Sequence, residues 1–184
     1  MERSFFMLKP DTLKRGLVEA VLERLKNAGL VIVGRKEMRA DRELALKHYA
    51  DSEEWYRNTG GRTIDSYHKQ GLDITEFFAA EDPIVVGKQI RQWLADFLQS
   101  GPVIAMVVEG PVGTVQAIRD LAGATSPEYA EKGTIRGDYG IDSYAGANGE
   151  GRALQNLVHA SESVREAKRE IRLWFPEDPG LAEF

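Results

Sequence analysis

The chain has 184 residues, enough for one domain with a hydrophobic core, and its 42% hydrophobic and 29% charged residues are typical of a soluble globular protein. A formal net charge of −5 disfavours nucleic acid and anionic membranes as partners, and no apolar stretch approaches the ~20 residues of a membrane helix. The absence of cysteine excludes disulfides and thiolate metal sites, so we expect a cytoplasmic protein that binds neither nucleic acid nor membrane.

The predicted secondary structure alternates strands and helices. Short apolar runs predict strands, and apolar residues at three- and four-residue spacing predict helices. In chain order the elements are a strand at 3–8, a helix from 12 to 29, a strand at 30–38, a helix at 40–50, a helix at 83–99, a strand at 101–110, a helix at 111–123, a strand at 154–160 and a helix at 163–173. Three stretches are expected to be irregular: a loop at 58–63, a turn at 146–151 and a surface extension at 176–184.

This order of elements predicts the fold class. Strands followed by helices that can cover a sheet favour an α+β sandwich of the ferredoxin-like βαββαβ kind, with an antiparallel four-stranded sheet. The chain is expected to form a single domain, 1–184, with an insertion at about 51–99 and a short tail at 176–184. The segment 125–153, rich in Gly, Asp and Ser, is too long for a simple connection, so we expect it to be functional.

His159, in the stretch NLVHASES, is the first candidate for chemistry. Ser163 followed by Glu166 is a capping-box pattern, so the imidazole is expected close to a helix N-terminus, whose free N–H groups favour an anion. Histidine is a recognised covalent nucleophile, and a neutral imidazole beside a phosphate could attack phosphorus. The alternative is a core histidine that hydrogen-bonds to the backbone.

Two cations are candidates for binding such an anion. Arg136 lies between two glycines in GTIRGD, where its guanidinium could offer a planar fork to phosphate oxygens, although a salt-bridged arginine in a turn would have the same pattern. Lys9 follows the first strand and could equally be solvated. The other two histidines, His48 and His68, lie in polar stretches and are expected to face solvent. The sequence contains neither a GxxxxGK[ST] phosphate-binding loop nor a metal-ligand cluster.

Seven stretches taken together resemble the nucleoside diphosphate kinases. They are MLKPD, RGL, SGPVIAMVVEG, GATSP, GTIRGDYG, NLVHASES and EIRLWF, and they occur in the order found in that family. The resemblance covers 1–50 and 100–175. Several independent motifs in one order are far more specific than any one of them.

The resemblance implies a ping-pong phosphotransferase. A nucleoside triphosphate would give its γ-phosphoryl group to His159, and the phosphohistidine would pass it to a different nucleoside diphosphate. The resemblance also implies Mg²⁺ that is held mainly by the nucleotide phosphates, so that no metal ligand is expected from the protein. It further implies a homo-oligomer, either a hexamer or a tetramer.

The resemblance also implies a role for each motif residue. The implied catalytic residues are the nucleophile His159, Glu170 that orients its ring, Tyr49 close to it, and Lys9 that contacts the sugar hydroxyl and the phosphate path. The implied nucleotide-binding residues are Lys9, Arg91 at the base, Arg119, Thr125 and Arg136 at the phosphates, and Asn156 at the ribose. Ser161 occupies the neighbouring hydroxyl position.

The sequence departs from the family at several positions. Arg91 stands where the family has a phenylalanine that stacks on the base. Arg91 could itself stack on the base, or an aromatic residue of the insertion could do so, and the sequence leaves that choice open among Trp55, Tyr56, Phe77, Phe78 and Trp93. The link at 142–156 is longer than usual, and Ala160 replaces a common glycine. A longer, archaeal-type form of this kinase resembles both insertions.

Two functions of other classes compete with the kinase. A nucleotide-binding or scaffold protein could keep the fold without turnover, but it would be expected to lose His159, Lys9 or Glu170, and all three are present. A histidine phosphocarrier would need an exposed histidine, but neither paired arginines nor the ribose-reading Asn156. The retained residues therefore favour the enzyme.

Overall fold

The computed structural model describes all 184 residues and contains one four-stranded antiparallel sheet. Its strands are β1 (Glu2–Leu8), β2 (Val31–Met38), β3 (Val103–Gly110) and β4 (Val158–Ala160). The strand order β2-β3-β1-β4 is that of a ferredoxin-like βαββαβ sandwich, so the predicted fold class is confirmed.

Nine α-helices connect and cover the strands. They are α1 (Pro10–Lys14), α2 (Val18–Asn27), α3 (Arg42–His48), α4 (Glu53–Gln70), α5 (Pro83–Gln99), α6 (Thr114–Ala122), α7 (Ile135–Tyr139), α8 (Tyr144–Gly149) and α9 (Val164–Trp174). Short 3-10 helices lie at Ile74–Glu76, Pro127–Tyr129 and Pro179–Ala182. No helix is both long and apolar enough to cross a membrane.

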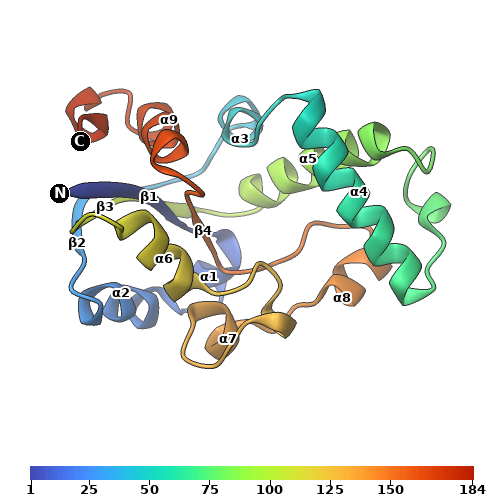
Figure 1. Cartoon of the computed structure of the whole chain (residues 1–184), viewed down its shortest axis with the longest axis horizontal. Coiled ribbons are helices and arrows are strands. Elements are labelled where there is room, and N and C mark those ends of the chain that lie inside the picture. The colour runs from blue at the N-terminus through green and yellow to red at the C-terminus, as the bar shows by residue number, and fades with distance from the viewer.

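Helices cover both faces of the sheet, which makes three layers (Figure 1). Side chains of β1 alternate between two cores, as the two-residue period of a strand requires. Phe5 and Met7 pack in one core with α3, α5 and α9, while Phe6 and Leu8 pack in the other with α2 and α6. Because both faces are buried, most of β3 and the second half of β1 are apolar.

Several local predictions are wrong, and each error has a physical cause. The helix predicted from 12 to 29 is two helices, because Gly16 takes a left-handed conformation with φ of +66° between α1 and α2. The strand predicted at 154–160 is only three residues long. The turn predicted at 146–151 includes part of α8, which Ser143 caps at Gly146 N.

The C-terminal tail is not a surface extension along its whole length. Ala182 is 1% exposed and belongs to the core between the sheet and α9, and Leu181 and Phe184 pack against that core. Arg3 also binds the tail by donating to the carbonyl oxygens of Gly180 and Leu181, both at 3.1 Å. The tail therefore contributes to one of the two helical layers.

The insertion at 51–99 forms the pair of helices α4 and α5, and the loop predicted at 58–63 lies inside α4. A β-carbon added at Gly60 would lie 1.9 Å from the carbonyl oxygen of Pro83, and one added at Gly87 would lie 2.2 Å from that of Tyr56. Gly60 and Gly87 therefore allow the two helix backbones to touch. The glycines in NTGGRT mark a close helix crossing rather than a turn.

This crossing predicts opposite effects for two adjacent substitutions. Gly60→Ala should lower the free energy of unfolding by about 2–3 kcal/mol, because its methyl group has no space. Gly61→Ala should leave stability unchanged or raise it by up to about 1 kcal/mol, because no atom lies within 4 Å of its added β-carbon and alanine favours helix. Urea unfolding of both variants measures the difference, and equal effects would contradict the proposed contact.

Candidate active site

His159 lies on the short strand β4, opposite Met7 of β1, and its side chain is 23% exposed. Its Nε2 atom lies 2.8 Å from Oε1 of Glu170 on α9. Ser161 donates to the other carboxylate oxygen of Glu170 at 2.5 Å. One buried carboxylate therefore binds both the imidazole of His159 and the hydroxyl group of Ser161.

The charge state of Glu170 determines which nitrogen of His159 is free. Burial alone would raise the pKa of Glu170, but the charge of His159 and the hydrogen bonds from His159 and Ser161 lower it to about 2. An ionised carboxylate can only accept a hydrogen bond, so Nε2 of His159 carries the proton. The lone pair is then on Nδ1, which is the nitrogen available for attack.

The helix α9 starts where the capping pattern predicts. Ser163 accepts a hydrogen bond from Glu166 N at 3.2 Å and begins the helix. Glu170 lies on the buried face of this helix with Ala167, Ile171 and Trp174. The amphipathic helix therefore places the carboxylate against the sheet.

His48 is buried, so the prediction that it faces solvent is wrong. The residue is 2% exposed, its ring centroid lies 4.4 Å from that of His159, and Trp174 donates from Nε1 to its Nδ1 at 3.2 Å. Burial, together with the charge of His159, holds the pKa of His48 well below its usual value, so the ring is neutral. His68, in contrast, is exposed and pairs with Glu81 at 2.9 Å.

The prediction missed His48 because its burial depends on distant residues. It follows the buried Ala45 by three positions on α3, which is the only local signal that it belongs to the inner face. The polar stretch around it hid that signal. Its Nε2 and the hydroxyl group of Tyr49 are buried without a hydrogen-bond partner.

Lys9 lies at the end of β1 and is almost fully buried. Its Nζ donates to Oδ1 of Asn156 at 2.7 Å, and the Asn156 amide donates in turn to the carbonyl oxygen of Thr125 at 2.9 Å. Burial lowers the pKa of Lys9 to about 8, with a further contribution from the charge of Arg136. Lys9 is therefore close to its titration point at neutral pH.

Leu157, between Asn156 and β4, is the one non-glycine residue with a left-handed backbone, with φ of +69°. Three hydrogen bonds hold it there. Its carbonyl oxygen accepts from Lys9 N at 2.8 Å and from Thr12 Oγ1 at 2.5 Å, and its N–H donates to Asp11 at 2.9 Å. Such strain is tolerated when the surrounding structure fixes it, and here it lies beside the candidate site.

The two candidate phosphate-binding arginines differ in their environments. Arg136 donates to the carbonyl oxygens of Gly123, Asn156 and Val158 at 2.7–3.0 Å, and burial lowers its pKa to about 10. Arg119 is exposed on α6 and makes no hydrogen bond or ion pair through its side chain. Arg136 thus connects α7 to the end of α6 and to the segment 156–158, whereas Arg119 is free to bind an anion.

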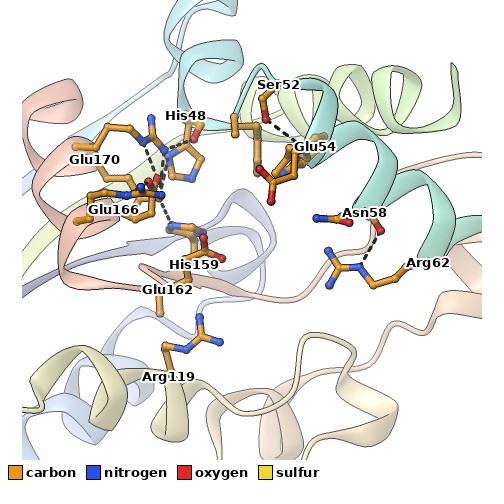
Figure 2. A pocket seen from close by; sticks show the side chains of 16 residues that line it. His48, Ser52, Glu54, Asn58, Arg62, Arg119, His159, Glu162, Glu166 and Glu170 are labelled. Carbon is orange, nitrogen blue, oxygen red and sulfur yellow. Dashed lines mark hydrogen bonds and ion pairs between the residues drawn. The ribbon is translucent and has the colours of Figure 1, made fainter. Parts of the chain in front are cut away.

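Two cavities meet at His159. The Lys9 cavity, of about 320 Å³, is lined by the motif residues Lys9, Arg119, Thr125, Arg136, Asn156 and His159, together with Tyr49 and Leu94. The α4 cavity, of about 410 Å³, lies between α4 and α9 and is lined in part by Trp55, Asn58, Arg62, Arg119, Glu162 and His159 (Figure 2). The structure therefore brings all the predicted site residues except Arg91 to the surface of a cavity.

Arg91 does not line either cavity. Its guanidinium donates to the carbonyl oxygens of Leu46 at 2.7 Å and Tyr49 at 3.3 Å, at the end of α3. It is 9% exposed, so its charge is used to bind the segment that carries His48 and Tyr49. Among the alternative residues for the base, Trp55 alone lines a cavity, whereas Tyr56 and Phe78 are buried and Phe77 and Trp93 pack in the insertion core.

One cluster of three potential metal-binding side chains lies at this site. His48, His159 and Glu170 have donor atoms within 4.8 Å of one another. Two imidazoles and one carboxylate, which is already bonded to His159 and Ser161, do not match the oxygen ligands that Mg²⁺ prefers. The donor set of these three residues therefore does not fit a protein-built magnesium site.

Comparison with known proteins identifies the same family that the sequence motifs resemble. The family described as "Nucleoside diphosphate kinase" matches residues 2–66 and 56–179. A nucleoside diphosphate kinase of Pyrobaculum aerophilum is 44% identical over 98% of both chains, and one of Archaeoglobus fulgidus is 40% identical over 97% of this chain and 89% of its own.

Solved structures give the same result. The crystal structure of the Pyrobaculum aerophilum NDP kinase has a TM-score of 0.93 over 97% of both chains. A transition-state mimic of the Borrelia burgdorferi nucleoside-diphosphate kinase, with bound vanadate and ADP, has a TM-score of 0.73 at 31% identity and covers 95% of this chain and 86% of its own.

The low pKa of Glu170 predicts a loss of stability in acid. Its folded-state pKa of about 2 lies below the ordinary value of 4.5, so the ionised carboxylate stabilises the fold above pH 4.5 and the stabilisation is lost as the pH falls toward 2. This shift corresponds to about 3 kcal/mol. Glu170→Gln should remove most of this acid dependence, whereas Glu23→Gln at an exposed position should keep it. Urea unfolding from pH 6 to pH 2.5 compares them, and parallel curves would refute the assignment.

Proposed function

This chain belongs to the nucleoside diphosphate kinase family, and we propose that it transfers the γ-phosphoryl group of a nucleoside triphosphate to a nucleoside diphosphate through Nδ1 of His159. The observation that carries this proposal is the 2.8 Å contact between Nε2 of His159 and the ionised Glu170. That contact leaves a lone pair on Nδ1 beside two cavities that contain unpaired cationic groups.

The chemistry requires two displacements at phosphorus. In the first, the Nδ1 lone pair forms a P–N bond with the γ-phosphorus, and the bond from that phosphorus to the β–γ bridging oxygen breaks, releasing a nucleoside diphosphate. In the second, a terminal oxygen of another nucleoside diphosphate attacks the same phosphorus, and the P–N electrons return to Nδ1. His159 keeps its Nε2 proton throughout, so Glu170 stabilises the positive ring of the phosphohistidine.

The walls of the Lys9 cavity supply groups for binding a nucleotide. Arg119, Arg136 and Thr125 bind phosphate oxygens, because phosphoryl transfer depends mainly on positioning and on neutralising the oxygens around phosphorus. Lys9 and Asn156, joined at 2.7 Å, bind the ribose hydroxyls and the path of the phosphoryl group. Tyr49 lines both cavities beside His159 and completes the catalytic set.

Mg²⁺ bound mainly by the nucleotide phosphates would supply positive charge that offsets the charge of the transferred group. Within the α4 cavity, Glu54 and Glu162 make no hydrogen bond or ion pair through their carboxylates. These two carboxylates would accept hydrogen bonds from water molecules on such an ion. The protein thus needs no dedicated metal ligand.

The remaining parts of the proposal concern the whole protein. The chain forms one kinase domain over 1–184, with α4 and α5 as its insertion, and acts in the cytoplasm. It assembles as a homo-hexamer or tetramer. Exposed apolar residues on the edge strand β2, Val31 at 58% and Val33 at 36%, support an association through that edge. Arg91 holds the end of α3 in place and does not bind the base.

Replacing the nucleophile tests the reaction. His159→Ala should lower the conversion of GDP and ATP to GTP and ADP by at least about 10⁴-fold, because the covalent route is lost. His68→Ala, at an exposed histidine whose Nε2 lies 2.9 Å from Glu81, should retain full activity. Wild-type protein incubated with γ-labelled ATP should carry an acid-labile, base-stable label that His159→Ala lacks. Undiminished turnover of His159→Ala would overturn the proposal, and nucleotide binding by the wild type without turnover would favour a binding protein.

The pKa of Lys9 predicts a pH dependence of nucleotide binding. With a pKa of about 8, the side chain loses its proton as the pH rises, and only the ammonium form attracts the nucleotide. Affinity for ADP should fall about tenfold between pH 7.5 and pH 9, because the fraction of Lys9 that is protonated falls by about that factor over this range. Lys9→Met should bind more weakly and lose this dependence. Calorimetry at each pH measures it, and equal slopes in the two proteins would exclude Lys9 as the titrating group.

A further inference from the structure

The inserted helix α4 has two distinct faces. The residues that pack on α5 and the insertion core recur at spacings of three and four, namely Tyr56, Gly60, Ile64 and Tyr67. The residues that line the α4 cavity occupy the neighbouring face, namely Trp55, Asn58 and Arg62. The contact between Gly60 and α5 therefore fixes which face of α4 is turned toward His159. Figure 2 shows Asn58 and Arg62 on this face.

We propose that Arg62 is a further nucleotide-binding residue, whose guanidinium binds phosphate oxygens from the side of the cavity opposite Arg119. This inference rests on the proposed kinase function. It adds a third arginine to the two that the motifs supply, and it assigns to the insertion a direct part in holding the substrate.

The bonding of Arg62 supports this role. Its Nε donates to the carbonyl oxygen of Asn58 at 3.1 Å, which orients the side chain along its own helix. Its two terminal amino groups have no partner, and it forms no ion pair, although Glu54 and Glu162 line the same cavity. Arg57, five residues earlier, differs because it binds Glu53 at 2.6 Å and lies outside both cavities.

The electrostatic surroundings place Arg62 with the other phosphate-binding cations. Burial raises the pKa of the Tyr144 phenol, and the charges of Arg62 and Arg136 both oppose that rise. The phenol therefore lies within range of both guanidinium groups. The charge of Arg119 in turn contributes to lowering the pKa of Arg136. By geometry, Arg62 and Arg119 line the α4 cavity, and Arg119 and Arg136 line the Lys9 cavity, so a polyphosphate that passes Arg119 would meet cations on both sides.

The chemistry of arginine indicates which part of the nucleotide it binds. A guanidinium with two free amino groups matches two oxygens of one phosphate, and its positive charge is complemented by the anionic phosphate but not by a neutral base. Because the α4 cavity and the Lys9 cavity meet at His159 and Arg119, a phosphate chain that reaches His159 enters the space in front of Arg62. Arg62 is therefore assigned to the terminal phosphates rather than to the base.

Arg62→Gln is the direct test, and Arg57→Gln on the same helix is its matched control. Arg62→Gln should raise the KM for the acceptor diphosphate about tenfold, while Arg57→Gln stays within about twofold of the wild type. Arg62→Lys, which keeps the charge but loses the fork, should recover part of the loss. Circular dichroism and thermal unfolding of each variant establish that the fold is intact. If Arg62→Gln unfolds, the comparison of Arg62→Lys with the wild type decides the result.

Calorimetry with ADP and AMP separates phosphate binding from other contacts. Arg62→Gln should weaken ADP about tenfold and AMP by less than about threefold. An equal loss of affinity for ADP and AMP would refute the assignment of Arg62 to the terminal phosphates. If Arg62→Gln bound both nucleotides as Arg57→Gln does, Arg62 would make no contact with the nucleotide. The binding measurement is also independent of turnover. If the wild type formed no phosphohistidine, the proposed function would fail, whereas a normal phosphohistidine with unchanged KM and ADP affinity in Arg62→Gln would reject only the role of Arg62.

Discussion

A carboxylate buried beneath a sheet must be compensated, because an isolated charge in a protein interior costs several kcal/mol. In this chain the charge of Glu170 is stabilised by hydrogen bonds with His159 and Ser161, which directly precede and follow Ala160. The same bonds that keep the carboxylate ionised also fix the proton on one nitrogen of the imidazole. The α9 helix, the strand β4 and the reactive atom are therefore positioned by one interaction.

The insertion has a comparable dependence on one contact. The helix pair α4 and α5 can pack closely only because Gly60 and Gly87 have no side chains at the crossing point. This close approach fixes the rotation of α4 about its own axis, and the rotation decides which of its polar residues reach the cavity beside His159. A packing requirement on one face thus determines which binding groups the other face presents.

Much of the fold could be predicted because its signals are local. The buried strands β1 and β3 are apolar runs, and Ser163 marks the start of α9 within a few residues. Other features depend on partners far along the chain. The burial of His48 requires Trp174, 126 residues later, and the glycines of α4 indicate a helix only once α5 is placed against them. Within the site, the motif residues followed from the family resemblance, whereas Arg62 lies in a segment without such motifs.

The left-handed backbone of Leu157 has a consequence for which side chains can act together. In an extended strand, residues three apart point to opposite sides, so Asn156 and His159 would face away from each other. One residue with φ of +69° between them breaks that alternation, and both side chains line the Lys9 cavity. A single reversal of backbone handedness thereby changes which side of the chain the later side chains face. Under the proposed function, it lets Asn156 bind the sugar and His159 accept the phosphoryl group of the same molecule.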